Sequence, residues 1–235
     1  MTELVMEATR IAKDLGTGAA QIRALKGVNL SLRGGELTLL MGPSGSGKTT
    51  LLSILGCMLT PTEGTVSVRG APIAGKNPED LAKLRRENIG FVFQSYHLFP
   101  TLTAADNVRL ALDVRGETGA ASRDKSSAAL EKVGLANKKS NYPRELSGGE
   151  QQRVAIARAV VGDPSVILAD EPTAALDTEN GKAIMGILAE IAKDPRRGVL
   201  VVTHDPRLVP YADRIVHIED GTIVREESGG AARKS

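Results

Sequence analysis

Short apolar runs separated by turn-forming residues dominate the first hundred positions of the chain. Runs at 28–32, 37–41, 65–69 and 89–93 are rich in Val, Ile, Leu or Phe and are separated by segments that contain Gly or Pro. Such runs favour β-strands, and the alternation at 65–69 is typical of a half-buried one. The first part of the chain is therefore predicted to mix antiparallel strands with one buried strand.

The apolar pattern then changes to a helical one. Asn77 and Pro78 are suited to open a short helix that ends near residue 87. Thr103 and Asp106 have the spacing of a capping box, and apolar residues recur at helical intervals from 101 to about 161. A helical insert is therefore predicted to interrupt the strand-containing part.

Two fully apolar runs, at 166–169 and 199–202, follow the insert. Between them, residues 178–192 place Ile184 and Leu188 on one helical face. Strands that are apolar throughout and alternate with a helix are typical of a buried parallel sheet. The sequence predicts an α/β fold.

Composition narrows the possible functions. The 235 residues include 30 Lys plus Arg and 28 Asp plus Glu, and aromatic residues make up only 3%. A formal net charge of +2 and few stacking rings disfavour direct nucleic-acid binding.

The single cysteine, Cys57, is predicted to be buried and unreactive. No apolar run is long enough to span a bilayer and the N-terminus is acidic, which predicts a soluble cytoplasmic chain, with residues 226–235 as a disordered tail.

A phosphate-binding motif follows the run at 37–41. It reads G-x-x-x-x-G-K-[ST] and precedes an apolar helical stretch. Backbone N–H groups of such a loop and the positive end of the helix bind polyphosphate, Lys48 reaches the β- and γ-phosphates, and Thr49 ligates Mg²⁺. The predicted nucleotide-binding residues are Gly42, Pro43, Ser44, Gly45, Ser46, Gly47, Lys48, Thr49 and Thr50.

Two adjacent carboxylates end the apolar run at 166–169. Asp170 is predicted to bind the Mg²⁺ ion that accompanies the nucleotide. Because side chains alternate along a strand, Glu171 is expected to point away from Asp170 and to act as general base on the attacking water.

A third motif narrows the family. Residues 146–153 read LSGGEQQR, in which Ser147 and Glu150 form a capping box at a glycine-rich helix start. This segment resembles the signature of ATP-binding-cassette ATPases. The resemblance implies one ATPase domain over residues 1–225. Its fold is that of a P-loop NTPase with a RecA-like parallel core, an N-terminal antiparallel β subdomain, and a helical insert at about 95–161 that carries the signature.

The resemblance also assigns roles to single residues. Gln94 is similar to the glutamine that contacts Mg²⁺ or the attacking water, and His204 to the histidine that contacts the γ-phosphate. Asp177 matches the D-loop aspartate, which organises the opposite site. Two chains are implied to pair head to tail around two ATP molecules, with Ser147, Gly148 and Gly149 of one chain covering the nucleotide of the other.

The chain departs from the family pattern at the adenine site and near the dimer interface. Leu15 stands at or beside the position where an aromatic ring usually stacks on the base. Leu15 or Val28 can offer apolar contact only, so weaker or less selective purine binding is expected. Ala174 replaces a serine of the D-loop.

Partners follow from the same resemblance. Segments 24–28, 51–56, 61–64 and 102–108 are similar to the lipoprotein-release and macrolide-exporter branch. That branch implies a membrane permease, often with a periplasmic adaptor, and a location on the cytoplasmic face of the inner or plasma membrane. An importer ATPase is the alternative, and a soluble cassette acting on ribosomes or DNA is a third reading.

An aromatic segment follows Gln94. Tyr96, Leu98, Phe99 and Pro100 either line a groove for a helix of the permease or pack beneath the helical insert. The sequence leaves both readings open.

Overall fold

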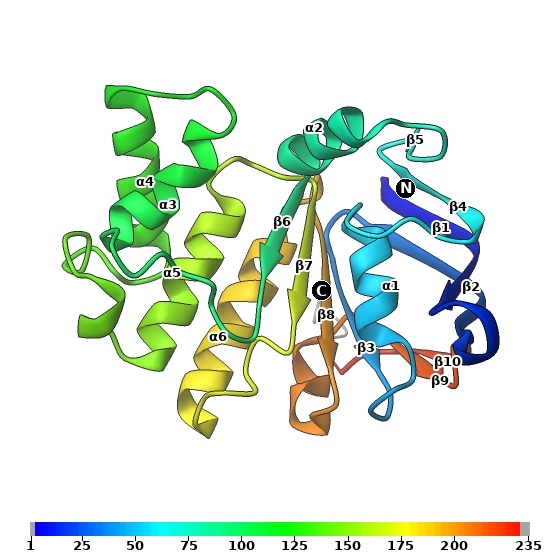
Figure 1. Cartoon of the computed structure of the whole chain (residues 1–235). Helices are drawn as coiled ribbons and strands as arrows, with labels where there is room; N and C mark the ends of the chain where they lie inside the picture. Colours follow the sequence, from blue (N-terminus) through cyan, green and yellow to red (C-terminus); the bar gives the residue numbers. More distant parts are fainter. Residues whose placement is uncertain (1–2, 231–235) are drawn as a thin grey trace.

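A parallel sheet forms the centre of the molecule, which is a computed structural model describing residues 3–230 (Figure 1). This sheet has the strand order β10-β9-β3-β8-β7-β6. Strands β3, β6, β7, β8 and β9 run parallel, and β10 is antiparallel to β9. The strands are β3 (Glu36–Met41), β6 (Ile89–Val92), β7 (Val166–Asp170), β8 (Gly198–Thr203), β9 (Arg214–Glu219) and β10 (Thr222–Ser228).

A second, antiparallel sheet has the order β2-β1-β4-β5. Its strands are β1 (Leu4–Leu15), β2 (Ile22–Arg33), β4 (Glu63–Val68) and β5 (Ala71–Pro72). The sequence analysis did not predict β1. Register shifts interrupt its pairing with β2, and Arg10 has a φ of +51°. Bulges of this kind break the two-residue alternation that identifies a strand.

Six α-helices lie within residues 3–230, and α1, α2, α5 and α6 contact the parallel sheet. Four begin at side-chain caps, since Asn77, Thr103, Ser147 and Asp177 each accept a hydrogen bond from the backbone N–H three residues later. The helices are α1 (Lys48–Leu55), α2 (Pro78–Asn88), α3 (Ala104–Asp113), α4 (Ala120–Lys132), α5 (Gly148–Val160) and α6 (Thr178–Ala192). No helix within residues 3–230 is both long and apolar enough to cross a membrane.

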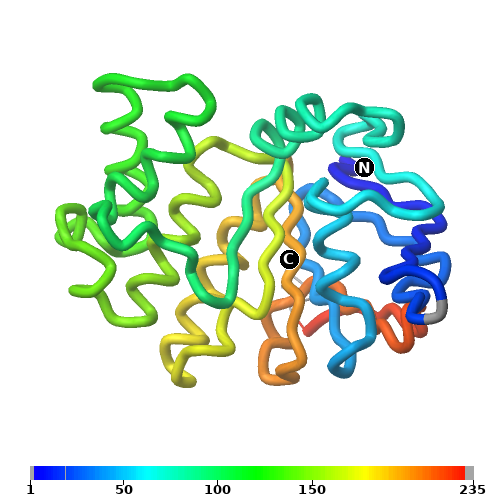
Figure 2. Tube along the Cα trace, in the orientation of Figure 1, coloured from blue at the N-terminus to red at the C-terminus, as the bar shows by residue number. Residues whose placement is uncertain are grey.

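Helices α3, α4 and α5 pack on one another and form the predicted insert between β6 and β7. Figure 2 shows this lobe beside the sheet, where the chain leaves at the end of β6 and returns at β7. The α/β fold, with an antiparallel β subdomain and a helical insert carrying the signature, is confirmed.

Two hydrophobic cores lie on opposite faces of the parallel sheet. Leu168 and Leu200 face the core shared with α1 and the antiparallel sheet, whereas their neighbours Ile167 and Val199 face the core beneath α5 and α6. Alternate residues of one strand therefore serve different cores, which explains why these strands are apolar throughout.

The predicted disordered tail is wrong for part of residues 226–235. Strand β10 continues to Ser228, and Glu226 forms an ion pair with Arg214 at 3.1 Å. Charged residues are common on an edge strand, so the charged composition of β10 resembles that of a disordered tail. The last five residues, 231–235, lie outside the described residues.

Candidate functional site

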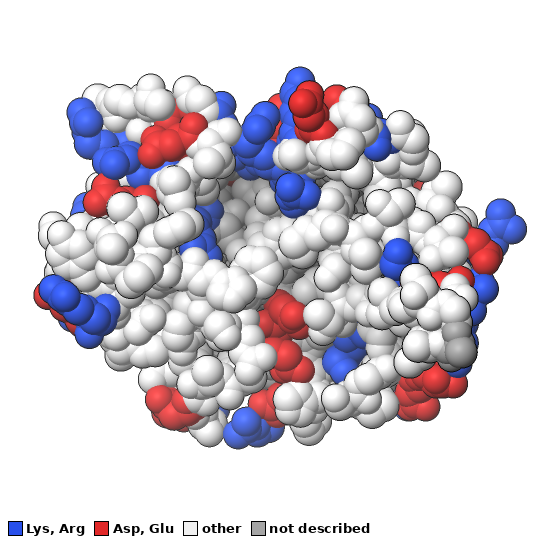
Figure 3. Space-filling model, in the orientation of Figure 1, with Lys and Arg blue, Asp and Glu red and all other residues white. Residues whose placement is uncertain are grey.

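The carboxyl ends of β3, β6, β7 and β8 meet at one edge of the sheet, where a cavity of about 800 Å³ opens. Figure 3 shows acidic side chains beside a basic one near the middle of this face. The cavity is lined by Leu15, Ile22, Arg23, Ala24, Pro43, Ser44, Gly45, Gly47, Lys48, Thr49, Thr50, Gln94, Asp170, Glu171, Ala174, Val202, His204, Asp220 and Gly221.

The loop between β3 and α1 has the geometry of an anion cradle. Gly47, at the N-cap of α1, has a φ of +97°, and a Cβ there would lie 2.8 Å from the carbonyl oxygen of Ala24. No side chain caps the amino end of α1, and the buried Ser46 hydroxyl has no hydrogen-bond partner among the described residues. Unfilled backbone donors at a positive helix end fit a polyphosphate.

Lys48 is held over this loop by the loop itself. Its ammonium donates to the carbonyl oxygens of Gly42 at 2.8 Å and Pro43 at 2.7 Å. Gly42 has no room for a side chain, because a Cβ would lie 2.0 Å from the carbonyl oxygen of Ile218. These two hydrogen bonds therefore hold the Lys48 ammonium beside the amino end of α1, where a bound anion can replace the carbonyl oxygens as its partner.

Asp170 and Glu171 line the same cavity, although strand alternation predicts that they point apart. That expectation is wrong because Glu171 leaves the extended conformation, with a φ of +46° and its N–H donating to the carbonyl oxygen of Val202 at 2.9 Å. Burial, followed by the charge of Glu171, raises the pKa of Asp170, and Lys48 opposes this. The two carboxylates thus face one space from different backbone conformations.

Glu171 is held by the end of β8. Its Oε1 lies 2.7 Å from His204 Nδ1, and its Oε2 accepts a hydrogen bond from the Thr203 hydroxyl at 3.3 Å. Gln94, after β6, lines the cavity as well. A carboxylate oriented in this way beside a phosphate cradle has the position that a general base needs.

The signature residues lie away from this cavity. Ser147 and Glu150 form the predicted capping box of α5. The Ser147 N–H donates to Glu150 Oε2 at 2.8 Å, and the Glu150 N–H donates to Ser147 Oγ at 3.2 Å. Gly148 and Gly149 lie at the amino end of the same helix, and Asp177 caps α6. None of Ser147, Gly148, Gly149 and Asp177 lines the nucleotide cavity of its own chain.

The rest of the cavity lining combines Leu15, which the sequence predicted, with residues that the sequence analysis did not name. Leu15 and Ile22 are paired across β1 and β2, and their side chains are 40% and 69% exposed. Asp220 and Gly221 reach the cavity from the β9–β10 turn. No motif marks Ile22, Asp220 or Gly221. Val28, considered for base contact, lies in the core instead.

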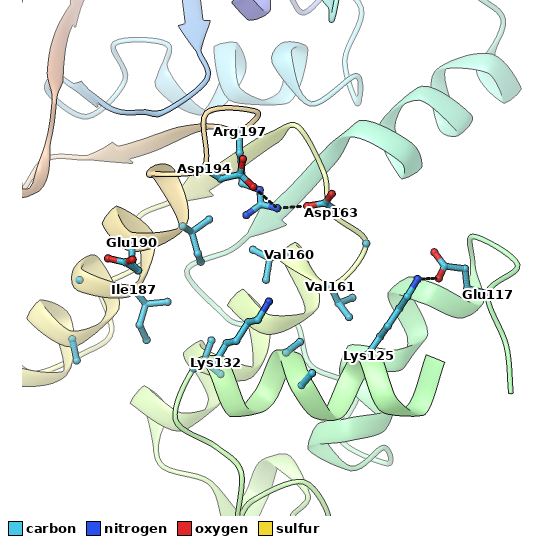
Figure 4. Close-up of a pocket in the computed structure, with 17 residues that line it drawn as sticks. Glu117, Lys125, Lys132, Val160, Val161, Asp163, Ile187, Glu190, Asp194 and Arg197 are labelled. Carbon is cyan, nitrogen blue, oxygen red and sulfur yellow. Dashed lines mark hydrogen bonds and ion pairs between the residues drawn. The ribbon is translucent and has the colours of Figure 1, made fainter. Parts of the chain in front are cut away.

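A larger cavity, of about 980 Å³, lies between α4, the end of α5 and α6 (Figure 4). Its charged lining residues are largely engaged with one another, as in the ion pairs of Arg197 with Asp163 at 2.5 Å and of Lys125 with Glu117. It contains no predicted site residue. Volume alone therefore does not identify the site of chemistry.

Comparison with known proteins gives the family. The family model of the ABC transporter matches residues 25–174. The chain is 44% identical over 219 residues to the uncharacterised ABC transporter ATP-binding protein YvrO of Bacillus subtilis (strain 168), covering 93% of this chain and 95% of that protein. It is 40% identical over 234 residues to the macrolide export ATP-binding/permease protein MacB of Shewanella sp. (strain W3-18-1), covering 100% of this chain. The chain spans only 36% of that MacB protein.

A solved structure agrees with these relatives. The dimeric post-hydrolysis state of the ATP-binding cassette MJ0796, bound to ADP and Pi, matches with a TM-score of 0.86 and 41% identity, covering 95% of this chain and 98% of that one. The family and fold predicted from the motifs are confirmed. The chain belongs to the ABC transporter family, as one of its ATP-binding and ATP-hydrolysing cassettes.

Proposed function

We propose that this cassette powers an export-type ABC system by driving a membrane permease from the cytoplasmic face of the membrane. The observation that carries the proposal is the convergence of Lys48, Asp170, Glu171 and His204 on one cavity. Relatives at 40–44% identity are named as macrolide or pyoverdine export ATP-binding/permease proteins, which supports export. Neither an importer nor a ribosome- or DNA-directed role is favoured by a specific feature of the structure.

The residues of the cavity have separate roles in the binding and hydrolysis of ATP. The backbone of the loop at 42–49 and Lys48 bind the phosphates, Glu171 takes a proton from the attacking water, and His204 contacts the γ-phosphate. Leu15 and Ile22 form the apolar wall against which the base rests.

Mg²⁺ fits the oxygen donors of the same cavity. Thr49, Gln94 and Asp170 supply a hydroxyl, an amide and a carboxylate, which are the hard ligands this ion takes. Burial raises the pKa of Asp170, so a divalent cation beside it stabilises the ionised form. When bound, the ion neutralises phosphate charge and leaves the protein side chains to orient water and nucleotide.

Two copies complete the sites. Ser147, Gly148 and Gly149 lie away from their own cavity, so we assign them, with Asp177, to the nucleotide of a second copy. The dimeric state of the similar MJ0796 cassette supports this arrangement. Since a nucleotide that bridges two chains binds only the dimer well, ATP stabilises the closed dimer and hydrolysis releases it.

A groove of about 580 Å³ between α2, the segment after β6 and the end of α3 is the proposed contact with the permease. Phe99 and Val114 are 51% and 56% exposed in it, and Arg85, Arg86 and Arg115 add positive charge. An apolar floor with a charged rim suits an amphipathic helix. A periplasmic adaptor and the residue limits of the domain and of its helical insert, 95–161, stay predictions.

The test is to express the tagged Glu171→Gln chain in its native cell, add ATP, solubilise the membranes mildly and identify what co-purifies. A permease with few membrane helices and a large extracytoplasmic domain supports the proposal. A many-helix permease with a solute-binding protein would make the chain part of an importer. Ribosomal proteins, or no membrane partner, would overturn the transport role.

A further inference from the structure

A strained turn follows Gln94. Tyr96 and His97 have φ values of +58° and +49°, so two successive residues with full side chains adopt the left-handed conformation. This conformation is unfavourable for residues other than glycine and persists only where the surroundings hold it. The turn's own hydrogen bonds, from Tyr96 N–H to Phe93 and from His97 N–H to Ser95, are local and do not fix it to the rest of the molecule.

Arg158, on α5, holds this turn from outside. Its guanidinium donates to the carbonyl oxygen of His97 at 2.5 Å through Nη1 and to that of Tyr96 at 2.8 Å through Nη2. The fork of an arginine matches two neighbouring acceptors, which the single ammonium of a lysine does not. Within residues 3–230 no carboxylate forms an ion pair with Arg158, so the two carbonyls are its polar partners there.

The turn lies between a residue that lines the chain's own nucleotide cavity and the signature, which is assigned to the nucleotide of the second copy. Gln94, two residues earlier, lines the nucleotide cavity of this chain. The Tyr96 hydroxyl lies against Gly148 of the signature, where a Cβ would be only 2.9 Å away. His97, Phe99 and Arg158 also line the groove assigned to the permease. The turn therefore lies against the signature and in the groove, two residues from the cavity residue Gln94.

We propose that Arg158 is a positioning residue that fastens the Tyr96–His97 turn to the signature helix. It fixes Gln94, which serves the chain's own ATP, relative to Ser147–Gly149, which serve the ATP of the second copy. The inference rests on the head-to-tail dimer of the proposed function. Removing the guanidinium leaves the phosphate loop intact, because that loop is held by β3, by α1 and by the hydrogen bond from the Gly221 N–H to the carbonyl oxygen of Ser46 at 3.1 Å. ATP binding to one chain should persist while closure of the dimer weakens.

The experiment compares four proteins: Glu171→Gln alone and the same background with Arg158→Ala, Arg158→Lys or Arg197→Ala. Arg197 is the matched control, a largely buried guanidinium that also donates to a backbone carbonyl, that of Pro164 at 3.1 Å, but beside the cavity of Figure 4. Binding of a fluorescent ATP analogue is measured at protein concentrations that keep the chain monomeric. ATP-induced dimerisation is measured by analytical ultracentrifugation, and thermal unfolding checks that each variant is folded.

Arg158→Ala is expected to raise the ATP concentration for half-maximal dimerisation at least tenfold, with the monomer's ATP affinity changed less than twofold. Arg158→Lys should recover part of the loss, and Arg197→Ala should behave as the parent. Dimerisation unchanged by Arg158→Ala, an equal loss with Arg197→Ala, or a parallel loss of monomer binding would overturn the inference.

If Arg158→Ala does not fold, Tyr96→Phe takes its place, because it removes only the hydroxyl that contacts Gly148. It should weaken dimerisation at least threefold and leave monomer binding unchanged; an unchanged dimer would count against the inference. A parent Glu171→Gln chain that stays monomeric with ATP would overturn the dimer of the proposed function. A dimerising parent with an unaffected Arg158→Ala variant overturns the role of Arg158 alone.

Discussion

His204 Nδ1 lies 2.7 Å from Glu171 Oε1, and this contact joins the ends of two parallel strands that are more than thirty residues apart. The imidazole side chain is 70% exposed and the carboxylate only 16%. The histidine is therefore free to turn towards a phosphate, whereas the glutamate is held in place. The contact orients the proposed general base before nucleotide arrives.

His204→Ala should lower kcat about 10- to 100-fold with ATP affinity changed less than about threefold, because the phosphate loop is untouched. Phosphate release and binding of a fluorescent ATP analogue measure the two quantities. His217→Ala is the control, since His217 also contacts a glutamate, Glu227 at 2.9 Å, but on β9 away from the cavity. Equal losses in both variants would contradict a role for His204 at the γ-phosphate.

Glu171→Gln should reduce hydrolysis by about 10²- to 10⁴-fold, because an amide does not accept the proton of the attacking water. ATP binding should persist, and the chain should accumulate as an ATP-bound dimer. Glu179→Gln, an exposed acid on α6 paired with Lys182, provides the control. Steady-state hydrolysis retained by Glu171→Gln would remove Glu171 from the role of base.

Leu15→Tyr should tighten ATP binding about two- to tenfold, because stacking contributes roughly 0.5–1.5 kcal/mol beyond apolar burial. Leu15 lines the cavity at 40% exposure, so a ring has space there. Leu15→Met, which adds no ring, should bind ATP as the parent does. Titration with a fluorescent ATP analogue measures both, and an equal effect of Met and Tyr would argue against base stacking at this position.

Cys57 should react slowly with iodoacetamide in the folded protein. Burial raises the pKa of its thiol from 9.0 to about 11, with Arg85 opposing. Near pH 8.5 this reduces the thiolate fraction roughly a hundredfold relative to the unfolded chain. Fast alkylation of the native protein, followed by mass spectrometry, would contradict the burial.

The same thiol makes stability fall at alkaline pH. Between pH 9 and 11 the unfolded thiol of Cys57 ionises and the folded one does not, so unfolding becomes more favourable as pH rises. Cys57→Ala should lose less stability than the parent between pH 8 and pH 10 in urea titrations. Identical slopes for the two proteins would show that the thiol is not responsible.

Features set by near neighbours in the chain were predictable from the sequence. Asn77, Thr103 and Ser147 cap their helices through N–H groups three residues away, and the loop at 42–49 takes its shape from its own glycines. The apolar runs also gave the parallel sheet, because a strand buried on both faces leaves no polar position. Motifs and spacing were therefore enough for the fold class and the family.

Tertiary structure decided what depends on partners distant in sequence. Leu15 meets Ile22 only because β1 pairs with β2 through several register shifts, and Arg158 meets the carbonyls of Tyr96 and His97 from sixty residues away. Glu171 shares a cavity with Asp170 because β8 supplies an acceptor for its N–H and thereby stabilises a backbone conformation that alternation does not foresee. Sequence periodicity reports which face a residue occupies, but a bulge or a left-handed residue resets that face, and only the packed neighbours determine where this happens.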